Sequence, residues 1–225
     1  MAKRILMIVT SHAELADTGT RTGFWLEELA VPYLAFIEEG SSVDICSPKG
    51  GRPPTDPKSE SQAAPAVRAF LADANAASKL ESTLRIADVR ESYDAYFVVG
   101  GHGVMWDLAI DRDLQALLAA AHAAGKVIAA VCHGPAALVN VKLSNGAFLC
   151  KDKRVAGFSN AEEAAVGLDR VVPFALQSML SDRGARYESG PLWGSFVVSD
   201  GKLITGQNPA SSLAVAKGTL QALAS

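Results

Sequence analysis

The sequence lacks the features of secreted and membrane proteins. Its 225 residues include only three cysteines, an odd number at wide spacing that matches neither a disulfide framework nor a paired metal motif. No stretch approaches the ~18 consecutive apolar residues of a membrane span, and the apolar run at 5–9 is too short for the core of a secretory signal. These absences predict a protein without a membrane segment, in a reducing, cytoplasmic compartment.

An excess of positive charge is also lacking. The chain has 21 lysines and arginines against 24 aspartates and glutamates, a net charge of −3. This balance provides no basic field for nucleic acid or anionic lipid, so we expect neither as a partner. Apolar residues make up 49% of the chain, and a globular chain of this length buries enough surface to fold without disulfide or metal.

Short apolar runs alternate with longer amphipathic stretches. Continuous runs such as 96–99 and 127–131 are typical of strands covered on both faces, as in a parallel sheet. The repeated order of strand and helix predicts an α/β fold, with a doubly wound, mostly parallel sheet of the flavodoxin-like kind and helices on both faces. The predicted strands are 4–9, 42–46, 95–99, 127–131, 154–157, 195–198 and 203–205. The predicted helices are 24–39, 63–78, 111–124, 135–139, 161–166, 173–182 and 210–223.

The proline- and glycine-rich loop at 48–54 is the one stretch that resembles a linker. The part of the chain before it holds too few strands to form a domain of its own. We therefore predict a single domain over 1–225, with 50–84 as an insertion or lid.

Cys132 is the strongest candidate for a reactive group. It ends the predicted buried strand 127–131, and a helix is expected to begin within about two residues. Ligands of open α/β sheets bind at the carboxyl ends of strands, and a tight turn there exposes a nucleophile, as in the Gly-x-Ser-x-Gly elbow. A helix start would lower the pKa of the thiol. The alternative is a small buried apolar residue.

The role of His133 is open on this pattern alone. It follows the cysteine directly, so its ring need not face the sulfur. It could act as a base, orient another group or cap the turn, and its backbone N–H could stabilise an oxyanion.

Other candidates are weaker when taken singly. Gly101 follows a buried strand and could bring a backbone N–H close to a developing oxyanion, although the dinucleotide-binding spacing is absent. Glu27 and Glu28 lie in the first turns of a predicted helix, where the helix dipole favours acids in any case. The same holds for Glu162 and Glu163.

Several sequence blocks, in order along nearly the whole chain, resemble the ThiJ/PfpI superfamily with its class I glutamine-amidotransferase-like fold. Within it the chain is most similar to the stress-inducible chaperone branch, which includes glutathione-independent glyoxalases (glyoxalase III). The blocks are 22–28 with 32–33, 47–48, 100–103 with 105–107, 130–135, 157–160 with 162–163, and 203–209.

The resemblance implies roles for particular residues. They are Cys132 as the nucleophile, His133 beside it, Glu28 as the catalytic carboxylate, Glu163 (or Glu162) as the acid that orients the histidine, Gly101 and His133 at the oxyanion, and Trp106 at the substrate. The metal ligands of some larger relatives have no convincing counterparts, so we expect neither a metal nor a cofactor. A carboxyl group buried beside the thiol should have a raised pKa.

The resemblance also implies an activity. A lyase of this branch converts methylglyoxal or a related 2-oxoaldehyde to a 2-hydroxy acid through a cysteine hemithioacetal, and relatives suggest a homodimer. Two alternatives stay open: a cysteine hydrolase (deglycase or amidase) using the same nucleophile, and a stress-response holdase chaperone or redox sensor whose cysteine is oxidised.

Overall fold

A seven-stranded sheet forms the centre of the protein in the computed structural model, which describes residues 2–60 and 64–225. The strand order is β3-β2-β1-β4-β5-β9-β8, and every neighbouring pair is parallel except β8 with β9. Its strands are β1 (Arg4–Ile8), β2 (Ser42–Ser47), β3 (Leu84–Arg85), β4 (Ala95–Val98), β5 (Val127–Val131), β8 (Val197–Asp200) and β9 (Leu203–Gly206). The predicted doubly wound, mostly parallel sheet is confirmed.

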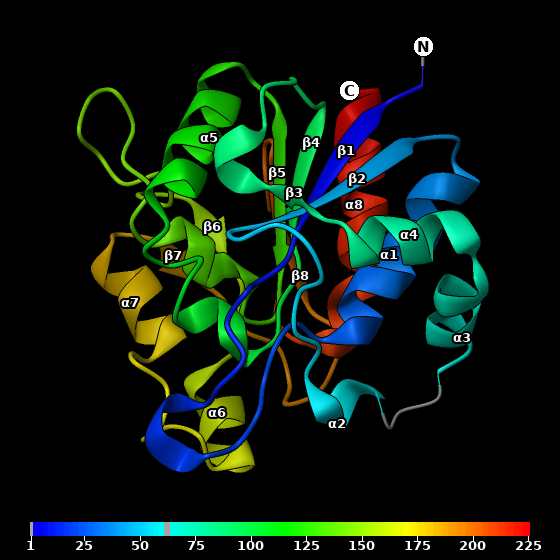
Figure 1. The fold of residues 1–225 in the computed structure, drawn as a ribbon. Coiled ribbons are helices and arrows are strands. Elements are labelled where there is room, and N and C mark those ends of the chain that lie inside the picture. Colours follow the sequence, from blue (N-terminus) through cyan, green and yellow to red (C-terminus); the bar gives the residue numbers. More distant parts are fainter. Residues whose placement is uncertain (1, 61–63) are drawn as a thin grey trace.

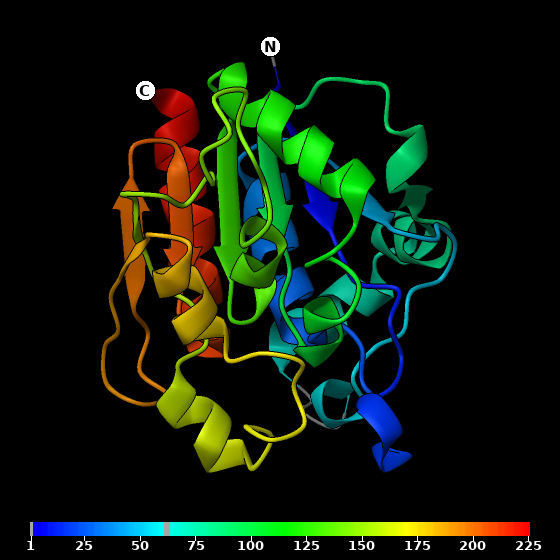
Figure 2. The same cartoon turned by 90° about the vertical axis from the view of Figure 1, so that its left-hand side faces the viewer.

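Helices cover both faces of this sheet (Figures 1 and 2). Helices α1 (Leu26–Glu38) and α8 (Ser212–Ala224) pack against each other on one face, and α5 (Arg112–Ala123) packs on the other. The remaining elements are α2 (Pro57–Glu60), α3 (Pro65–Ala72), α4 (Ala74–Glu81), α6 (Asn160–Val166), α7 (Leu176–Asp182), the short 3-10 helices η1 (Ala16–Thr18), η2 (Ile86–Asp88), η3 (His102–Met105), η4 (Gly134–Leu138) and η5 (Pro209–Ser211), and a second small sheet of β6 (Arg154–Val155) and β7 (Arg186–Tyr187).

The three central strands explain why the fold forms. Every residue of β4 and β5 is buried, and so is every residue of β1 after Arg4. Burying apolar strands on both faces is the main stabilising contribution in a sheet of this kind. The chain leaves β1 for β2 on one side and returns to β4 on the other, so a crevice opens at the carboxyl ends of β1 and β4.

The single helix expected at 63–78 is wrong. Residue 63 lies outside the described residues, and the remainder forms two helices, α3 and α4, that meet at Asp73. The Asp73 carboxylate accepts hydrogen bonds from the backbone N–H groups of Asn75 and Ala76, so it caps α4 and ends the first helix.

The shortest elements were missed or misjudged from the sequence. Strands β3 and β7 have two residues each, too few for an alternating pattern to appear. In place of the α-helix expected at 135–139 the structure has the 3-10 helix η4, whose five residues make fewer than two turns. Strand β8 is antiparallel to β9, joined to it by a hairpin at the sheet edge.

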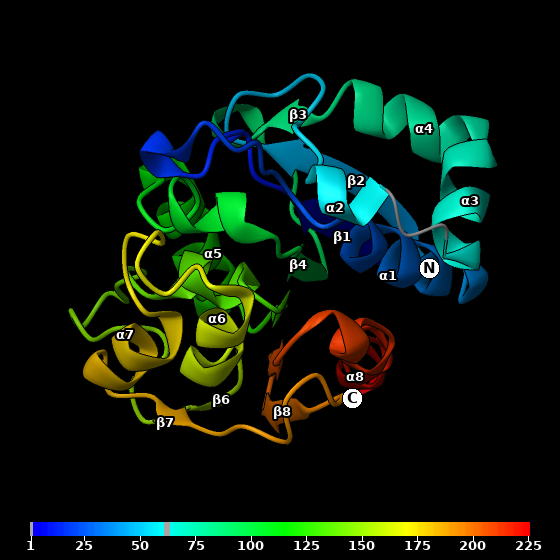
Figure 3. The ribbon, with the colours of Figure 1, turned by 90° about the horizontal axis from the view of Figure 1, so that it is seen from below.

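The described parts of the stretch 50–84, residues 50–60 and 64–84, contain α2, α3 and α4 and lie along α1 and the β2–β3 edge of the sheet (Figure 3). Its first part braces the segment before α1. The Phe24 N–H donates to the Pro54 carbonyl at 3.0 Å, and the Thr22 hydroxyl donates to the Asp56 carboxylate at 2.9 Å. This part of the stretch therefore fixes how α1 enters the molecule.

Over residues 2–60 and 64–225, no helix combines the length and the apolar character needed to cross a bilayer. The homodimer and the cytoplasmic compartment expected from the sequence stay predictions.

Gly134, directly after the turn that holds Cys132, tests the packing of this region. A Cβ atom there would lie 2.6 Å from the backbone oxygen of Val98 in β4. Backbone atoms in a central strand yield little, so we expect Gly134→Ala to lower the free energy of unfolding by about 3 kcal/mol in denaturant titrations. Gly125→Ala is the comparison, because its φ is +66° but no atom lies within 4 Å of the new Cβ, and it should cost only about 1 kcal/mol. Equal costs would contradict this account.

Candidate active site

Cys132 occupies a strained turn at the carboxyl end of β5. Its φ is +60°, a left-handed conformation that non-glycine residues rarely adopt. The surrounding backbone enforces it: the Cys132 N–H donates to Gly206 of β9 at 3.0 Å, and the Cys132 carbonyl accepts from the Phe158 N–H at 2.8 Å. Strain of this kind persists only where neighbours hold it, and it concentrates at functional sites.

Two glycines let the backbone after β4 pass between Cys132 and α1. A Cβ atom on Gly100 would lie 2.4 Å from the Glu28 carboxyl and 2.8 Å from Cβ of Cys132. Gly101 has φ +103°, and a Cβ there would lie 2.6 Å from the backbone nitrogen of Trp25. A side chain at Gly100 would separate Glu28 from the thiol, and one at Gly101 would collide with the backbone just before α1.

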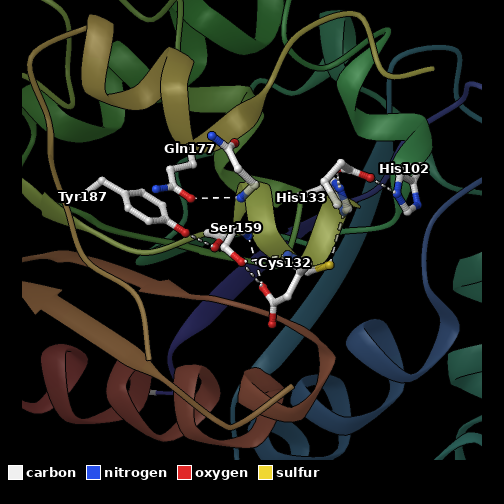
Figure 4. A network of polar contacts seen from close by, with 10 residues as sticks. His102, Cys132, His133, Ser159, Gln177 and Tyr187 are labelled. Carbon is white, nitrogen blue, oxygen red and sulfur yellow. Dashed lines mark hydrogen bonds and ion pairs between the residues drawn. The ribbon is translucent and has the colours of Figure 1, made fainter. Parts of the chain in front are cut away.

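A chain of polar contacts runs from the thiol through two rings (Figure 4). Sγ of Cys132 lies 3.3 Å from Nδ1 of His133, and Nε2 of His133 lies 2.8 Å from Oε2 of Glu163. The other oxygen of Glu163 lies 2.9 Å from Nε2 of His102. The structure thus brings Glu163, and not Glu162, to His133. His102 was not among the residues to which the sequence assigned a role.

The charges in this chain follow from burial and from the shared carboxylate. Burial raises the pKa of Glu163, but the hydrogen bonds with His102 and His133 outweigh it and bring that pKa to about 2. Burial, followed by the nearby His102, lowers the pKa of His133 to about 4. At neutral pH Glu163 is therefore ionised and His133 neutral. Nε2–H of His133 then donates to Glu163, which leaves the lone pair of Nδ1 facing the sulfur.

Glu28 lies on the other side of the thiol. Burial raises the pKa of its carboxyl to about 8, although hydrogen bonds with Cys132 and with the Gly100 N–H, the latter at 2.9 Å, oppose the rise. Its second oxygen, Oε1, is buried with no hydrogen-bond partner in the described part of the chain. A neutral carboxylic acid suits this environment better than a carboxylate does.

The expectation that the pKa of the Cys132 thiol is lowered is wrong. Burial, and then the Glu28 carboxyl, raise the pKa of Cys132 well above its ordinary value, while hydrogen bonds from the Gly101 and His133 backbone N–H groups oppose this in part. The helix that was expected to supply a favourable dipole is only the five-residue η4. The resting group is a thiol, and it needs a base to become a nucleophile. The two N–H groups point at the sulfur, where they can also meet an oxyanion.

A cavity of about 330 Å³ opens above the sulfur. Its polar floor consists of Gly101, His102, Cys132 and His133 with Asn208 at one side, and its walls are Trp25, Phe158, Val166, Trp193, Pro209 and Ala210. These walls come from four separate segments of the chain, so no local sequence pattern indicated them. Within the described ranges, neither 50–60 nor 64–84 contributes to this lining, and a lid formed by the stretch 50–84 stays a prediction.

Trp106, expected at the substrate, lies elsewhere. Its indole stacks on the ring of His12, with centroids 5.1 Å apart and planes 3° from parallel. It is absent from the cavity lining of the described residues. The tryptophans that line the cavity are Trp25 and Trp193.

The cluster of His102, His133 and Glu163 also has the composition of a metal site. Each offers one ligand atom, and these atoms lie within 4.8 Å of one another. Two imidazoles and a carboxylate bind divalent zinc in many enzymes. A metal there would replace the hydrogen bonds of Glu163 with His102 and with His133, and the second of these sets the tautomer of His133. The cluster therefore serves either the ion or the thiol. The expectation of no metal stays a prediction.

Similarity to known proteins assigns the family. A sequence profile described as the DJ-1/PfpI family matches residues 20–222. The chain belongs to the DJ-1/PfpI family. The motif-based assignment to the ThiJ/PfpI superfamily is thereby confirmed.

Relatives in the DJ-1/PfpI family include named enzymes. The glutathione-independent glyoxalase HSP31 of Saccharomyces cerevisiae is 28% identical over 98% of both chains. The crystal structure of glyoxalase III from Candida albicans superimposes with a TM-score of 0.88, at 27% identity over 98% of this chain and 97% of that one. The Rapid Encystment Protein 24 kDa of Francisella tularensis superimposes with a TM-score of 0.95, at 43% identity over 98% and 99% of the two chains.

The buried carboxyl of this DJ-1/PfpI protein makes stability depend on pH. Because the pKa of Glu28 rises from 4.5 unfolded to about 8 folded, its contribution is fully present below pH 4.5 and is lost as pH rises through 8. We expect Glu28→Gln to gain free energy of unfolding relative to the wild type between pH 5 and 8.5, on the order of 4 kcal/mol. Urea titrations at both pH values measure this. A difference that does not change with pH, or one matched by Glu27→Gln, would contradict a protonated Glu28.

Proposed function

We propose that this protein is a glutathione-independent glyoxalase that hydrates 2-oxoaldehydes to 2-hydroxy acids with Cys132 as its nucleophile. The observation that carries the proposal is the thiol placed between a neutral imidazole nitrogen and a protonated carboxyl, at the floor of a cavity whose described lining has no lysine, arginine, aspartate or glutamate. Glyoxalases that share the fold over their full lengths support it. Incubating the pure protein with methylglyoxal, without any thiol cofactor, and measuring lactate tests it.

In the first step the aldehyde is captured. Nδ1 of His133 takes the thiol proton while sulfur bonds to the aldehyde carbon. The aldehyde oxygen becomes an alkoxide, which the N–H groups of Gly101 and His133 stabilise. Protonated Glu28 then gives its proton to this oxygen. The product is a hemithioacetal beside a Glu28 carboxylate and a His133 imidazolium that is stabilised by Glu163.

In the second step one proton moves between neighbouring carbons. The Glu28 carboxylate removes the proton from the carbon that bears sulfur, and the imidazolium protonates the adjoining carbonyl oxygen, which gives an enediol. Glu28 then returns its proton to the second carbon, and His133 takes one from the hydroxyl on the first. The product is a thioester, and no external oxidant or reductant is used, because the aldehyde carbon is oxidised as its neighbour is reduced.

In the last step water attacks the thioester carbon. The Glu28 carboxylate accepts a proton from this water, and the imidazolium protonates the departing sulfur. The 2-hydroxy acid leaves, and Cys132, His133 and Glu28 return to their starting protonation states. The net reaction adds one water to the oxoaldehyde, the chemistry of a hydro-lyase.

A hydrolase acting on glycated amines or amides is the second candidate. It would use the same cysteine but would need room for a leaving amine, and a cavity of about 330 Å³ has that room. Comparing release of amine from a glycated peptide with lactate formation from free methylglyoxal separates the two activities.

Replacing the nucleophile tests the assignment of Cys132. Cys132→Ala should abolish turnover and leave the fold intact, because little volume is removed at the turn. Cys46→Ala and Cys150→Ala are matched controls, since both thiols are buried and neither lines the cavity in the described structure. Lactate assays with unfolding curves decide this. Activity retained in Cys132→Ala would remove it as the nucleophile, and activity lost in a folded control would identify another cysteine.

Glu28 is tested as the proton carrier. Glu28→Gln keeps the shape but cannot exchange a proton, so turnover should fall by about 10²–10⁴. In the wild type, kcat/KM should fall above about pH 8, where Glu28 loses the proton that the first step needs. Glu27→Gln is the control, because neighbours on a helix lie about 100° apart and cannot both face the sulfur. Unchanged turnover in Glu28→Gln, or a loss confined to Glu27→Gln, would refute this role.

A further inference from the structure

The cavity above Cys132 is much larger than the substrate of the simplest glyoxalase reaction. A three-carbon oxoaldehyde fills roughly 90 Å³, the space of about three waters at about 30 Å³ each. The cavity measures about 330 Å³. A small substrate would leave most of this space to water, which weakens both binding and the electrostatic contacts of the reacting groups.

The spare space has apolar walls. Beyond the polar floor, the lining consists of Trp25, Phe158, Val166, Trp193, Pro209 and Ala210. No lysine, arginine, aspartate or glutamate side chain belongs to the lining in residues 2–60 and 64–225. Such a surface offers nothing to pair with a phosphate, a carboxylate or an ammonium group, and burying one unpaired would cost free energy. It fits a neutral, apolar substituent.

Trp193 forms the outer part of this wall and is held there. Its backbone is in the left-handed region, with φ +61°, and its side chain is 48% exposed. Its ring lies 5.9 Å from that of Phe158, which in turn lies 4.3 Å from the ring of His133. An exposed tryptophan in a strained backbone needs a specific restraint.

Glu162 provides the restraint. Its Oε1 atom accepts three hydrogen bonds: from the Trp193 N–H at 3.0 Å, from the Gln207 amide at 3.0 Å and from the Asn208 amide at 2.8 Å. Its Oε2 atom accepts from both the N–H and the hydroxyl of Ser159, closing the cap of α6. Glu162 therefore connects the Trp193 loop to the helix that carries Glu163. This connection fixes the distance between the cavity wall and the reacting groups.

We infer that this enzyme selects 2-oxoaldehydes whose substituent is bulkier than methyl, either aromatic or branched aliphatic, and binds that substituent against the wall that Phe158 and Trp193 form. The inference rests on the proposed function and names the substrate class of the same site. The aldehyde carbon sits at the sulfur, and the apolar group fills the space toward the mouth. Trp193 and Glu162 are then specificity-determining and positioning residues, and neither takes part in proton transfer.

Steady-state kinetics with three aldehydes tests this: methylglyoxal, phenylglyoxal and 4-methyl-2-oxopentanal. We expect kcat/KM for the two larger aldehydes to exceed that for methylglyoxal by about tenfold or more, because added apolar contact in a fitted pocket is worth about that much. Trp193→Ala should remove the preference mainly through a higher KM, with kcat little changed, because the lost contact exists in the ground state as well as in the transition state.

Leu192→Ala is the matched control for Trp193→Ala. Leu192 is the adjacent residue, 51% exposed, and is not among the described residues that line the cavity, so its removal should leave the preference intact. Trp193→Phe should restore most of the preference, and Glu162→Gln should raise KM for the larger aldehydes more than for methylglyoxal. If a variant does not fold, the ratio of kcat/KM between the larger aldehydes and methylglyoxal in the wild-type protein still tests the inference.

The outcomes separate the two proposals. Turnover of methylglyoxal with no preference for the larger aldehydes, or equal losses for all three in Trp193→Ala, would overturn the inferred substrate class and leave the glyoxalase intact. Absence of turnover with every aldehyde would overturn the proposed function and this inference with it.

Discussion

The close approach of the Glu28 carboxyl to the Cys132 thiol, with only the Gly100 backbone beside them, is the constraint on which the site depends. Burial keeps the Glu28 carboxyl protonated, and burial together with this carboxyl keeps the Cys132 thiol protonated at rest. The arrangement costs stability at neutral pH and above. In return it holds a proton donor and a nucleophile within reach of one substrate atom, with the neutral Nδ1 of His133 as the base that starts the reaction.

The rest of the molecule maintains that approach. Strand β4 delivers the glycines, β5 delivers the cysteine in its left-handed turn, and the segment at 22–26 is braced by Pro54 and Asp56 so that α1 presents Glu28. Glu163 and Glu162 are neighbours on α6 with separate tasks. The first holds two imidazoles and the second holds the cavity wall. A single helix turn thereby fixes the distance between the reacting groups and the surface that faces the substituent.

Much of this could be predicted from the sequence because its signals are local. The long apolar runs of β4 and β5, the strand-to-helix turn at Cys132 and the glycines after β4 each lie within a few residues of chain. Features formed by distant segments could not be predicted in this way. The cavity walls come from four separate segments, and the second imidazole on Glu163 comes from η3, 61 positions away. The raised pKa of the thiol is caused by burial, which a local sequence pattern does not reveal. Trp106 was assigned to the substrate on motif position alone, and its stacking partner His12 comes from another segment.

The neutral state of the Cys132 thiol has a consequence for chemical selectivity. Peroxides and alkylating agents react with thiolates far faster than with thiols. In the proposed mechanism the Cys132 thiol loses its proton only as sulfur bonds to the aldehyde, so we expect this thiol to react slowly with both kinds of reagent. The same burial that slows its ionisation thus distinguishes carbonyl electrophiles, which fit the cavity and are steadied by two backbone N–H groups, from oxidants that need a ready-made anion.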